Sequence, residues 1–313
     1  MRVLVTGSSG FVGAHTVGVL ARRGHEVIGV DLDHPVAGDR PAQFIECDVT
    51  DEAALTGIIL RHRPDSIVHA AAITPGEDDA SEQSTIMLVN QVSTLTVLLA
   101  AARSGCRRFV FLSSAAVYAD PEPGVLLTEG SAVRENGGVY AQSKLGSERF
   151  CAGALRSLGV PATVLRIGPV YGEFERPTAS RGRMSPILQA IELADHSDPT
   201  ICNSRLSVYN WIHGDDVGLA IQAVIEAGVP GPLYNLAGSP ATVEETFAAL
   251  RQLIPGMHVE WTDLVGRANV PVSTISRPIS SDLIRSELSF SQTVDLHHGL
   301  ARVLKFRDKR RDG

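Results

Sequence analysis

The chain has 313 residues, of which 44% are hydrophobic and 20% are charged, and its formal net charge is −7 at pH 7. This length is sufficient for one large α/β domain or for two closely joined domains. The acidic balance argues against nucleic acid as a partner, because neutralising phosphates requires a clustered positive surface. Residues 302–311 form a basic tail, which we interpret as a solvated terminus.

Cysteine and histidine placement predicts neither a disulfide framework nor a metal site. The four cysteines lie far apart, without a C-x-x-C pair and without a histidine at metal-ligand spacing. The N-terminal apolar run has the length of a strand rather than of a signal peptide, and no segment approaches the length of a membrane span. We therefore expect a cytoplasmic protein with no membrane partner and no bound metal.

The first element to carry function is a glycine-rich turn, residues 7–13, between a predicted strand (residues 3–5) and a predicted helix (residues 14–23). Glycine lets the backbone turn tightly and approach a pyrophosphate, and the helix N-terminus supplies free N–H groups and a favourable dipole. The G-x-x-G-x-x-G spacing is typical of a dinucleotide cradle. The residues that we assign here to the cofactor are Gly7, Ser9, Gly10, Phe11, Val12 and Gly13.

The next predicted strand, residues 26–30, ends at Asp31. A carboxylate at this position accepts hydrogen bonds from the adenosine ribose hydroxyls and repels a 2′-phosphate. The nearest basic residue that could bind such a phosphate is Arg40, and no basic residue follows Asp31 directly. The sequence therefore predicts NAD rather than NADP as the cofactor.

Strands and helices then alternate along the chain. Short apolar runs at residues 66–70, 109–112 and 162–167 are separated by stretches of helical spacing, at residues 53–61, 86–104 and 142–158. This alternation favours right-handed βαβ crossovers and a parallel sheet covered on both faces. Gly105 and Gly159 stand where the C-caps of two of these helices are expected. The predicted fold class is a doubly wound α/β sheet of the Rossmann type.

After residue 167 the pattern loosens into segments rich in glycine, proline and charge, which we expect to lie as loops over the carboxyl edge of the sheet. We predict a dinucleotide-binding domain over residues 1–167 and a smaller, discontinuous substrate-binding region over residues 168–313. Residues 206–212 are predicted to return a strand to the main sheet, and about residues 206–228 to return to the first domain.

Tyr140 and Lys144 are predicted to carry the chemistry. Residues four apart on a helix face the same way, and a neighbouring ammonium favours the phenolate of the tyrosine. Such a phenolate takes the proton of a substrate hydroxyl while a hydride leaves the same carbon. Ser113 and Ser114 follow a buried strand at the same sheet edge, where a hydroxyl can bind the reacting oxygen.

Together these motifs resemble the extended short-chain dehydrogenase/reductase family, the NAD-dependent epimerase/dehydratase group. The resemblance runs from Thr6 through the Ser114-Ala115-Ala116-Val117-Tyr118 stretch and residues 166–172, and continues weakly to Phe290. It implies Ser114 as the substrate-contacting serine and Lys144 on the nicotinamide ribose. It gives Asn90 an interior structural and proton-relay role, and we count Asn90, with Tyr140 and Lys144, among the predicted cofactor-binding residues. It also implies a homodimer formed through residues 86–102 and 142–158. The further cofactor contacts that it implies are Asp48, Val49, Ala70, Ala71, Ala72, Pro169 and Val170.

Three reactions of such proteins can be weighed. Dehydratases of this kind have a threonine and two acids where this chain has Ser114-Ala115-Ala116, so dehydration is disfavoured. Two usual anchors for a substrate nucleotide are replaced by Gly168 and Tyr209. The main hypothesis is therefore an NAD-dependent dehydrogenase acting on a secondary alcohol of a sugar or sugar acid. The alternatives are a nucleotide-sugar (UDP-hexose type) 4-epimerase with tightly held NAD and, more remotely, a non-catalytic NAD-sensing regulator.

Arginine suits a carboxylate as well as a phosphate, so we expect arginines to bind the substrate. The residues assigned to the substrate are Thr74, Ser114, Ala115, Arg176, Arg183 and Arg277.

Overall fold

In the computed structural model, the described residues are 1–35, 41–74, 80–228, 231–264 and 266–311. Arg40 lies outside them. A seven-stranded parallel sheet forms the centre of the described part. In sheet order its strands are β11 (Leu233–Leu236), β6 (Ala162–Ile167), β5 (Arg108–Ser114), β4 (Ser66–His69), β1 (Arg2–Thr6), β2 (Glu26–Asp31) and β3 (Gln43–Glu46).

The strand order reverses between β1 and β4, which connect in opposite directions across the sheet. At such a reversal the two following loops diverge and leave a crevice at the carboxyl ends of the strands. The glycine loop follows β1, so the predicted cofactor cradle opens at this crevice. The doubly wound α/β class is confirmed.

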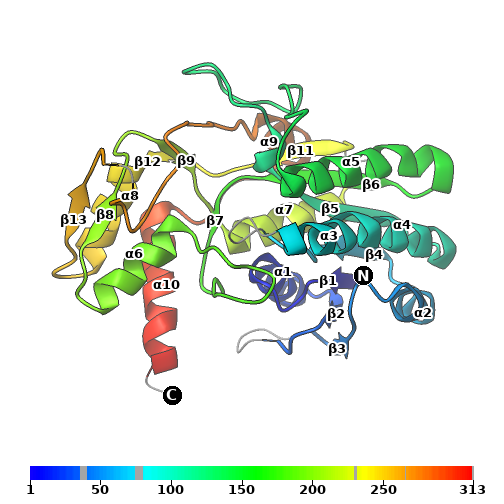
Figure 1. Cartoon of the computed structure of the whole chain (residues 1–313). Coiled ribbons are helices and arrows are strands. Elements are labelled where there is room, and N and C mark those ends of the chain that lie inside the picture. The colour runs from blue at the N-terminus through cyan, green and yellow to red at the C-terminus, as the bar shows by residue number, and fades with distance from the viewer. Residues whose placement is uncertain (36–40, 75–79, 229–230, 265, 312–313) are drawn as a thin grey trace.

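Helices cover both faces of this sheet (Figure 1). Alternate side chains of each strand point to opposite faces, so Val3 and Val5 pack on one side and Leu4 on the other. The first face carries α1 (Phe11–Arg22) and α7 (Gly214–Glu226). The second face carries α2 (Glu52–His62), α4 (Ser93–Ser104) and α5 (Val139–Leu158).

Two predicted helix ends are confirmed. Gly105 ends α4 with φ of 75°, and Gly159 ends α5 with φ of 70°. This left-handed backbone conformation favours glycine, because other L-residues meet a steric penalty there.

The C-terminal part forms a second core at one end of the molecule (Figure 1). It packs α6 (Pro186–Asp195), α8 (Val243–Leu253) and α10 (Leu296–Arg311) around small sheets. The remaining strands are β7 (Val170–Tyr171), β8 (Thr200–Cys202), β9 (Val208–Asn210), β10 (Ile212–His213), β12 (Pro240–Thr242) and β13 (Val259–Trp261). The remaining helices are α3 (Ala80–Met87), the π-helical turn η1 (Leu88–Val92), the 3₁₀ turn η2 (Ala115–Val117) and α9 (Asp282–Leu288).

The prediction that residues 206–212 add a strand to the main sheet is wrong. They form β9, which pairs antiparallel with β12, and β10, which pairs with β7. The apolar segment of β11 occupies the sheet edge beside β6 instead. Within residues 206–228 it is α7 that packs against α1 and the main sheet. The division of the chain at residue 167 stays a prediction.

The statement that no segment approaches the length of a membrane span is also wrong. The continuous helical run Glu82–Ser104 has 23 residues and is long and apolar enough to cross a membrane. Half of its most apolar window is buried inside the protein, where α4 packs against α2 and α5. It therefore has the contacts of a core helix. Core helices can be as long and as apolar as helices that cross a membrane.

Candidate active site

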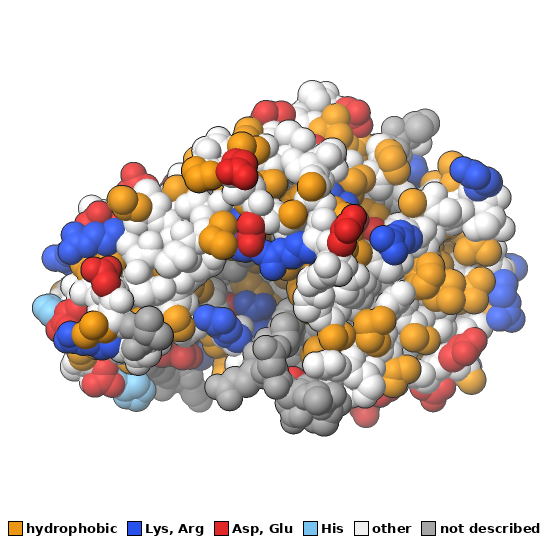
Figure 2. Space-filling model, turned by 45° about the horizontal axis from the view of Figure 1, so that its top comes forward, with side chains coloured by type: hydrophobic (Ala, Val, Ile, Leu, Met, Phe, Trp, Pro, Cys, Tyr) orange, Lys and Arg blue, Asp and Glu red, His pale blue; other side chains and the backbone are white. Residues whose placement is uncertain are grey.

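A cavity of about 380 Å³ lies at the carboxyl edge of the sheet, between the main sheet and the C-terminal part. Figure 2 shows the hollow on this face, with Lys and Arg side chains in and beside it. Residues from both parts of the chain line it: Gly7, Gly10, Phe11, Val12, Gly13, Ala70, Ala72, Thr74, Leu112, Ser113, Ser114, Tyr140, Lys144, Ile167, Gly168, Pro169, Val170, Phe174, Arg176, Thr178, Ser180, Arg181, Arg183, Met184, Ser185, Pro186, Tyr209 and Trp211.

The glycine loop is close-packed in a way that only glycine allows. Gly7 has φ of 67°, and a Cβ there would lie 2.6 Å from the backbone nitrogen of Ala71. A Cβ on Gly13 would lie 1.8 Å from the carbonyl oxygen of Gly7. The helix that begins at Phe11 has no side-chain cap, and its N-terminus faces the cavity, so the loop fits a bound pyrophosphate.

Asp31 stands at the end of β2, and its Oδ2 accepts a hydrogen bond from the backbone N–H of Ser9 at 2.8 Å. The hydroxyl oxygen of Ser9 is buried and has no hydrogen-bond partner. An unsatisfied hydroxyl beside a carboxylate fits a ligand that carries hydroxyl and phosphate oxygens. These two residues are therefore placed to hold the adenosine side of a dinucleotide.

Of the other predicted cofactor residues, some line the cavity and others lie outside its lining. Asp48 accepts hydrogen bonds from the N–H and hydroxyl of Thr50, both at 2.8 Å, and Val49 is buried beside it. Asn90 is fully buried behind the cavity, where its amide contacts both backbone groups of Ile73 and the hydroxyl of Ser143. Its hydrogen bonds hold the segment after β4 rather than reaching into the cavity. Ala70, Ala72, Pro169 and Val170 line the cavity, and Ala71 is buried against the glycine loop.

Ser114 and Tyr140 both line the cavity and share a hydrogen bond. Ser114 ends β5, and Tyr140 is the second residue of α5. Burial raises the pKa of Tyr140 above its usual value, whereas a hydrogen bond with Ser114 and the positive charge of Arg181 act in the opposite direction. A phenol in this setting is held protonated until a nearby cation or ligand favours the phenolate.

Lys144 lies one helical turn after Tyr140, with its Nζ 5.9 Å from the centre of the Tyr140 ring. The ammonium is buried and donates to the carbonyl of Leu112 at 2.9 Å. Burial lowers the pKa of Lys144 to about 8, and the negative charge of Glu148 opposes that shift. The predicted serine, tyrosine and lysine thus line one cavity with the glycine loop.

A buried ion pair behind these residues was missed by the sequence reasoning. Glu148 accepts from Arg166 at 2.7 and 3.0 Å and from the hydroxyl of Ser113 at 2.5 Å. The pair joins α5 to β6, and so it fixes the helix that carries Tyr140. The spacing of Glu148, four residues after Lys144, was the available signal.

The arginines divide between two sides of the cavity. Arg176 and Arg181 lie over the glycine loop, whereas Arg183 donates to the carbonyl of Pro271 at 3.2 Å on the C-terminal side. Arg277 is not a lining residue, and its guanidinium pairs with Asp120. Thr74 lines the cavity and donates to the carbonyl of Ser180 at 3.3 Å. The predicted residue Ala115 lies in η2, outside the lining.

Two aromatic rings complete the C-terminal side. The rings of Tyr209 and Trp211 stack with centres 5.0 Å apart and planes at 10°. Burial raises the pKa of Tyr209, and the positive charges of Arg183 and Arg277 oppose this rise. The aromatic pair and Arg183 thus line the C-terminal side of the cavity.

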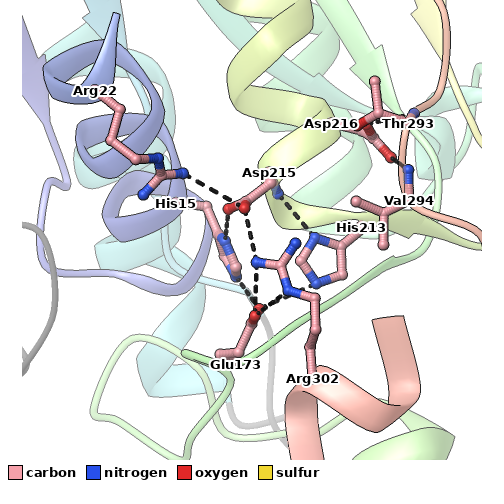
Figure 3. A network of polar contacts seen from close by, with 9 residues as sticks. All are labelled: His15, Arg22, Glu173, His213, Asp215, Asp216, Thr293, Val294 and Arg302. Atoms are coloured by element: carbon pink, nitrogen blue, oxygen red, sulfur yellow. Dashed lines mark hydrogen bonds and ion pairs between the residues drawn. The ribbon is translucent and has the colours of Figure 1, made fainter. Parts of the chain in front are cut away.

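Close to α1 lies a polar network of His15, Glu173, His213, Asp215 and Arg302 (Figure 3). Two of its histidine nitrogens and one of its carboxylate oxygens lie within 4.8 Å of one another, as metal ligands do. The Nδ1 of His213 accepts the N–H of Asp215, so its Nε2 carries the proton and faces Glu173 at 3.0 Å. Arg302 contacts both carboxylates at 2.7 Å. Because that guanidinium already supplies the positive charge, we assign the group as an ion-pair network that binds α10 to the sheet domain.

The fold and the site together define a dinucleotide-binding enzyme of the Rossmann type. Residues 3–237 match the model of the NAD dependent epimerase/dehydratase family, and the chain belongs to this family. The predictions of the family, of an enzyme and of NAD as its cofactor are confirmed.

The relatives include both reaction types of the family name. The dTDP-glucose 4,6-dehydratase of Streptomyces niveus is 26% identical over 99% of this chain and 94% of its own length. The UDP-glucose 4-epimerase of Klebsiella pneumoniae is 35% identical, over 38% of this chain and 94% of its own length. Among solved structures, the UDP-glucose 4-epimerase of Thermotoga maritima, crystallised with UDP-glucose, has a TM-score of 0.85 at 23% identity, covering 99% of each chain.

Proposed function

We propose that this protein is an NAD-dependent oxidoreductase that removes hydride from a secondary alcohol of a sugar-like substrate bearing an anionic group, such as a sugar acid. One observation carries the proposal. Ser114, Tyr140 and Lys144 share a cavity with the glycine loop, and among its described lining residues there are arginines and a lysine but no carboxylate.

The side chains have separate roles in this reaction. Tyr140, as the phenolate, takes the proton of the substrate hydroxyl, and Ser114 donates a hydrogen bond to the same oxygen. NAD, held by the glycine loop and Asp31, supplies the acceptor for the hydride that leaves the carbinol carbon. The O–H bond and the C–H bond of the carbinol break, and the carbon–oxygen single bond becomes a carbonyl. The charge of Lys144 favours the phenolate and, below a pH of about 8, is largely retained.

Dehydration has less support than hydride transfer alone. Removing water from a sugar requires an acid and a base near the carbon that loses its hydroxyl. The described lining residues include neither Asp nor Glu, and the two residues after Ser114 are alanines. The nearby carboxylate of Glu175 is buried and accepts hydrogen bonds from the N–H and the hydroxyl of Ser185.

A nucleotide-sugar 4-epimerase of the UDP-hexose type is the second candidate. The stacked pair Tyr209 and Trp211, with Arg183 beside it, supports this reading, because such a surface suits a base or sugar face next to a phosphate. The same Ser114, Tyr140 and Lys144 would oxidise the carbinol, and hydride would return to the opposite face. A non-catalytic NAD sensor has the least support, since sensing alone requires no proton-transfer tyrosine.

The deciding experiment begins by denaturing freshly purified protein and assaying the released NAD. Sugar acids and nucleotide sugars are then screened with added NAD while the absorbance of reduced nicotinamide is followed. We expect little retained cofactor and steady reduction with a sugar acid. Near-stoichiometric retained NAD, with conversion of a nucleotide sugar and no net reduction, would replace the first candidate by the second.

A homodimer is part of the proposal. Leu88, Val92, Leu95 and Leu99 are 37–51% exposed and follow one another at helical spacing along η1 and α4. An apolar stripe of this kind on a helix face suits a second copy of the chain. Sedimentation should give a dimer for the wild type and a monomer for Leu95→Glu, and a monomeric wild type would contradict the proposal.

Cytoplasmic location is proposed as well. All four cysteines are free thiols buried in the described structure, as is usual for proteins of reducing compartments. Fractionation of cells that make the protein would test this assignment.

A further inference from the structure

Residues 173–185, which we call the arginine loop, fold back over the glycine loop. The backbone N–H of Thr74 donates to the carbonyl of Ser180 at 2.9 Å, which ties the loop to the segment after β4. Its first arginine, Arg176, donates from Nη1 to the carbonyl of Ser9 at 3.4 Å. The backbone of the glycine loop is thus in direct contact with a cation from a distant part of the chain.

Arg181 reaches the same place. Its guanidinium carbon lies 5.1 Å from the centre of the Phe11 ring, at the first residue of α1. Its charge also opposes the rise that burial causes in the pKa of Tyr140. Arg176 and Arg181 thus line the same cavity as Tyr140 and contact the glycine loop.

Arg181 is fixed from behind by a buried carboxylate. Glu175, whose side chain is 3% exposed, accepts from Arg181 at 2.5 Å and from the N–H and hydroxyl of Ser185 at 2.8 and 2.6 Å. The Nε of Arg181 is buried and has no hydrogen-bond partner. Buried donors are normally paired, so this one indicates an acceptor that a ligand supplies.

The electrostatics of this place favour an anion. The N-terminus of a helix carries a partial positive charge, and α1 has neither a capping side chain nor an acidic residue in its first turn. Two guanidinium groups beside it add to that charge, which the carboxylate of Glu175 offsets at Arg181, and no carboxylate is among the described lining residues. An anion with two charges, placed between the helix and the arginines, removes this repulsion.

We propose that Arg176 and Arg181 form a clamp that binds the pyrophosphate of NAD beside the N-terminus of α1, next to the glycine loop. This inference rests on NAD as the cofactor of the proposed function, and it holds for either candidate reaction. The contact of Arg176 with the glycine loop itself favours the cofactor over an anionic substrate. Arg183, two residues after Arg181, faces the substrate side and serves as the matched control.

The test measures binding of NADH, ADP-ribose and adenosine to the wild type and to the Arg176→Gln, Arg181→Gln and Arg183→Gln variants, without substrate. Each of the first two changes should weaken NADH and ADP-ribose binding by about tenfold, because each removes a charge-assisted contact to a phosphate. Adenosine, which lacks phosphate, should bind all four proteins equally. Arg183→Gln should keep wild-type affinity for all three ligands.

The outcomes separate the clamp from the proposed function. Unchanged ADP-ribose affinity in Arg176→Gln and Arg181→Gln, with a raised KM for the substrate, would assign these arginines to the substrate and overturn the clamp. A wild-type protein that binds no NADH would contradict the proposed function itself. Arg181→Lys keeps the charge and should recover part of the affinity. If Arg181→Gln lost adenosine binding as well, the loss would be structural and the clamp would be overturned.

Discussion

The glycine loop and the arginine loop border the same cavity, yet they are built in opposite ways. The glycine loop works through backbone: Gly13 must lack a Cβ because the carbonyl of Gly7 occupies that space. The arginine loop works through long side chains, of which Arg181 is held in place by the buried Glu175. A site made of backbone tolerates almost no substitution, whereas a site made of side chains can be adjusted. The first therefore leaves a recognisable motif in the sequence, and the second leaves only scattered charges.

The largest effect is expected at Tyr140, which lines the same cavity as the two loops. Tyr140→Phe removes the proton acceptor, and kcat should fall by about 10²–10⁴-fold. NADH affinity should stay within twofold of the wild type, roughly, because the ring remains. Tyr209→Phe is the matched control, since it deletes a phenol elsewhere in the cavity and should change KM more than kcat. Equal loss of kcat in both variants would remove Tyr140 from its proposed role.

Substitution in the glycine loop should have the next largest effect. Gly13→Ala places a methyl group 1.8 Å from the carbonyl of Gly7, so the loop must shift. We expect NADH binding to weaken by about a hundredfold or the protein to lose several kcal/mol of stability. Gly57→Ala is the control on the exposed face of α2, where nothing lies within 4 Å. It should raise stability by about 0.5–1 kcal/mol in denaturant titration. A benign Gly13→Ala would contradict the backbone argument.

A smaller effect is expected at Asp31. Asp31→Asn keeps the shape but removes the charge that accepts from Ser9. NADH binding should weaken by about tenfold, and discrimination against NADPH should decrease, because a 2′-phosphate is no longer repelled. Titration of the variant with NADH and NADPH measures both effects. An unchanged preference would place the ribose elsewhere.

The smallest effect concerns pH. The positive charge of Arg181 favours the phenolate of Tyr140, so Arg181→Gln should raise the pKa of Tyr140. The activity for alcohol oxidation rises with pH as Tyr140 loses its proton. Its acid limb should therefore move to higher pH, by about half a pH unit for a charge that is not in direct contact. A limb that moves downward, or one that does not move in a pH profile of kcat/KM, would contradict this coupling.

Much of the fold was predictable from local patterns. The alternation of apolar runs and helical spacing gave the doubly wound sheet, and Gly105 and Gly159 marked two helix ends correctly. The sequence did not reveal which segment forms the strand at the sheet edge beside β6. Residues 206–212 and residues 233–236 are both short runs rich in apolar residues, and only the second run joins the main sheet. Which of them reaches the sheet edge depends on tertiary packing rather than on local pattern. The sequence analysis expected a helix over residues 86–104 and did not foresee that α3, η1 and α4 join into one continuous run of membrane-spanning length, Glu82–Ser104.

The candidate site divides in the same way. Gly7, Ser114, Tyr140 and Lys144 line one cavity, as their positions at strand ends and on one helix face suggested. Glu175 was not predicted as part of the site, because its contact with Arg181 comes from folding of the arginine loop across the chain. A carboxylate that holds an arginine in place has no fixed spacing in sequence, and only the packed structure brings them together.

The arginine-lined cavity has a further consequence for how ligands arrive. The chain carries a net charge of −7, so most of its surface repels anions, while Lys144 and three arginines gather in one hollow. Walls of low dielectric focus the field of such a group at its mouth. Anionic ligands are thus guided to a single entrance, and their association rate, rather than only their affinity, falls as salt shortens the reach of that field.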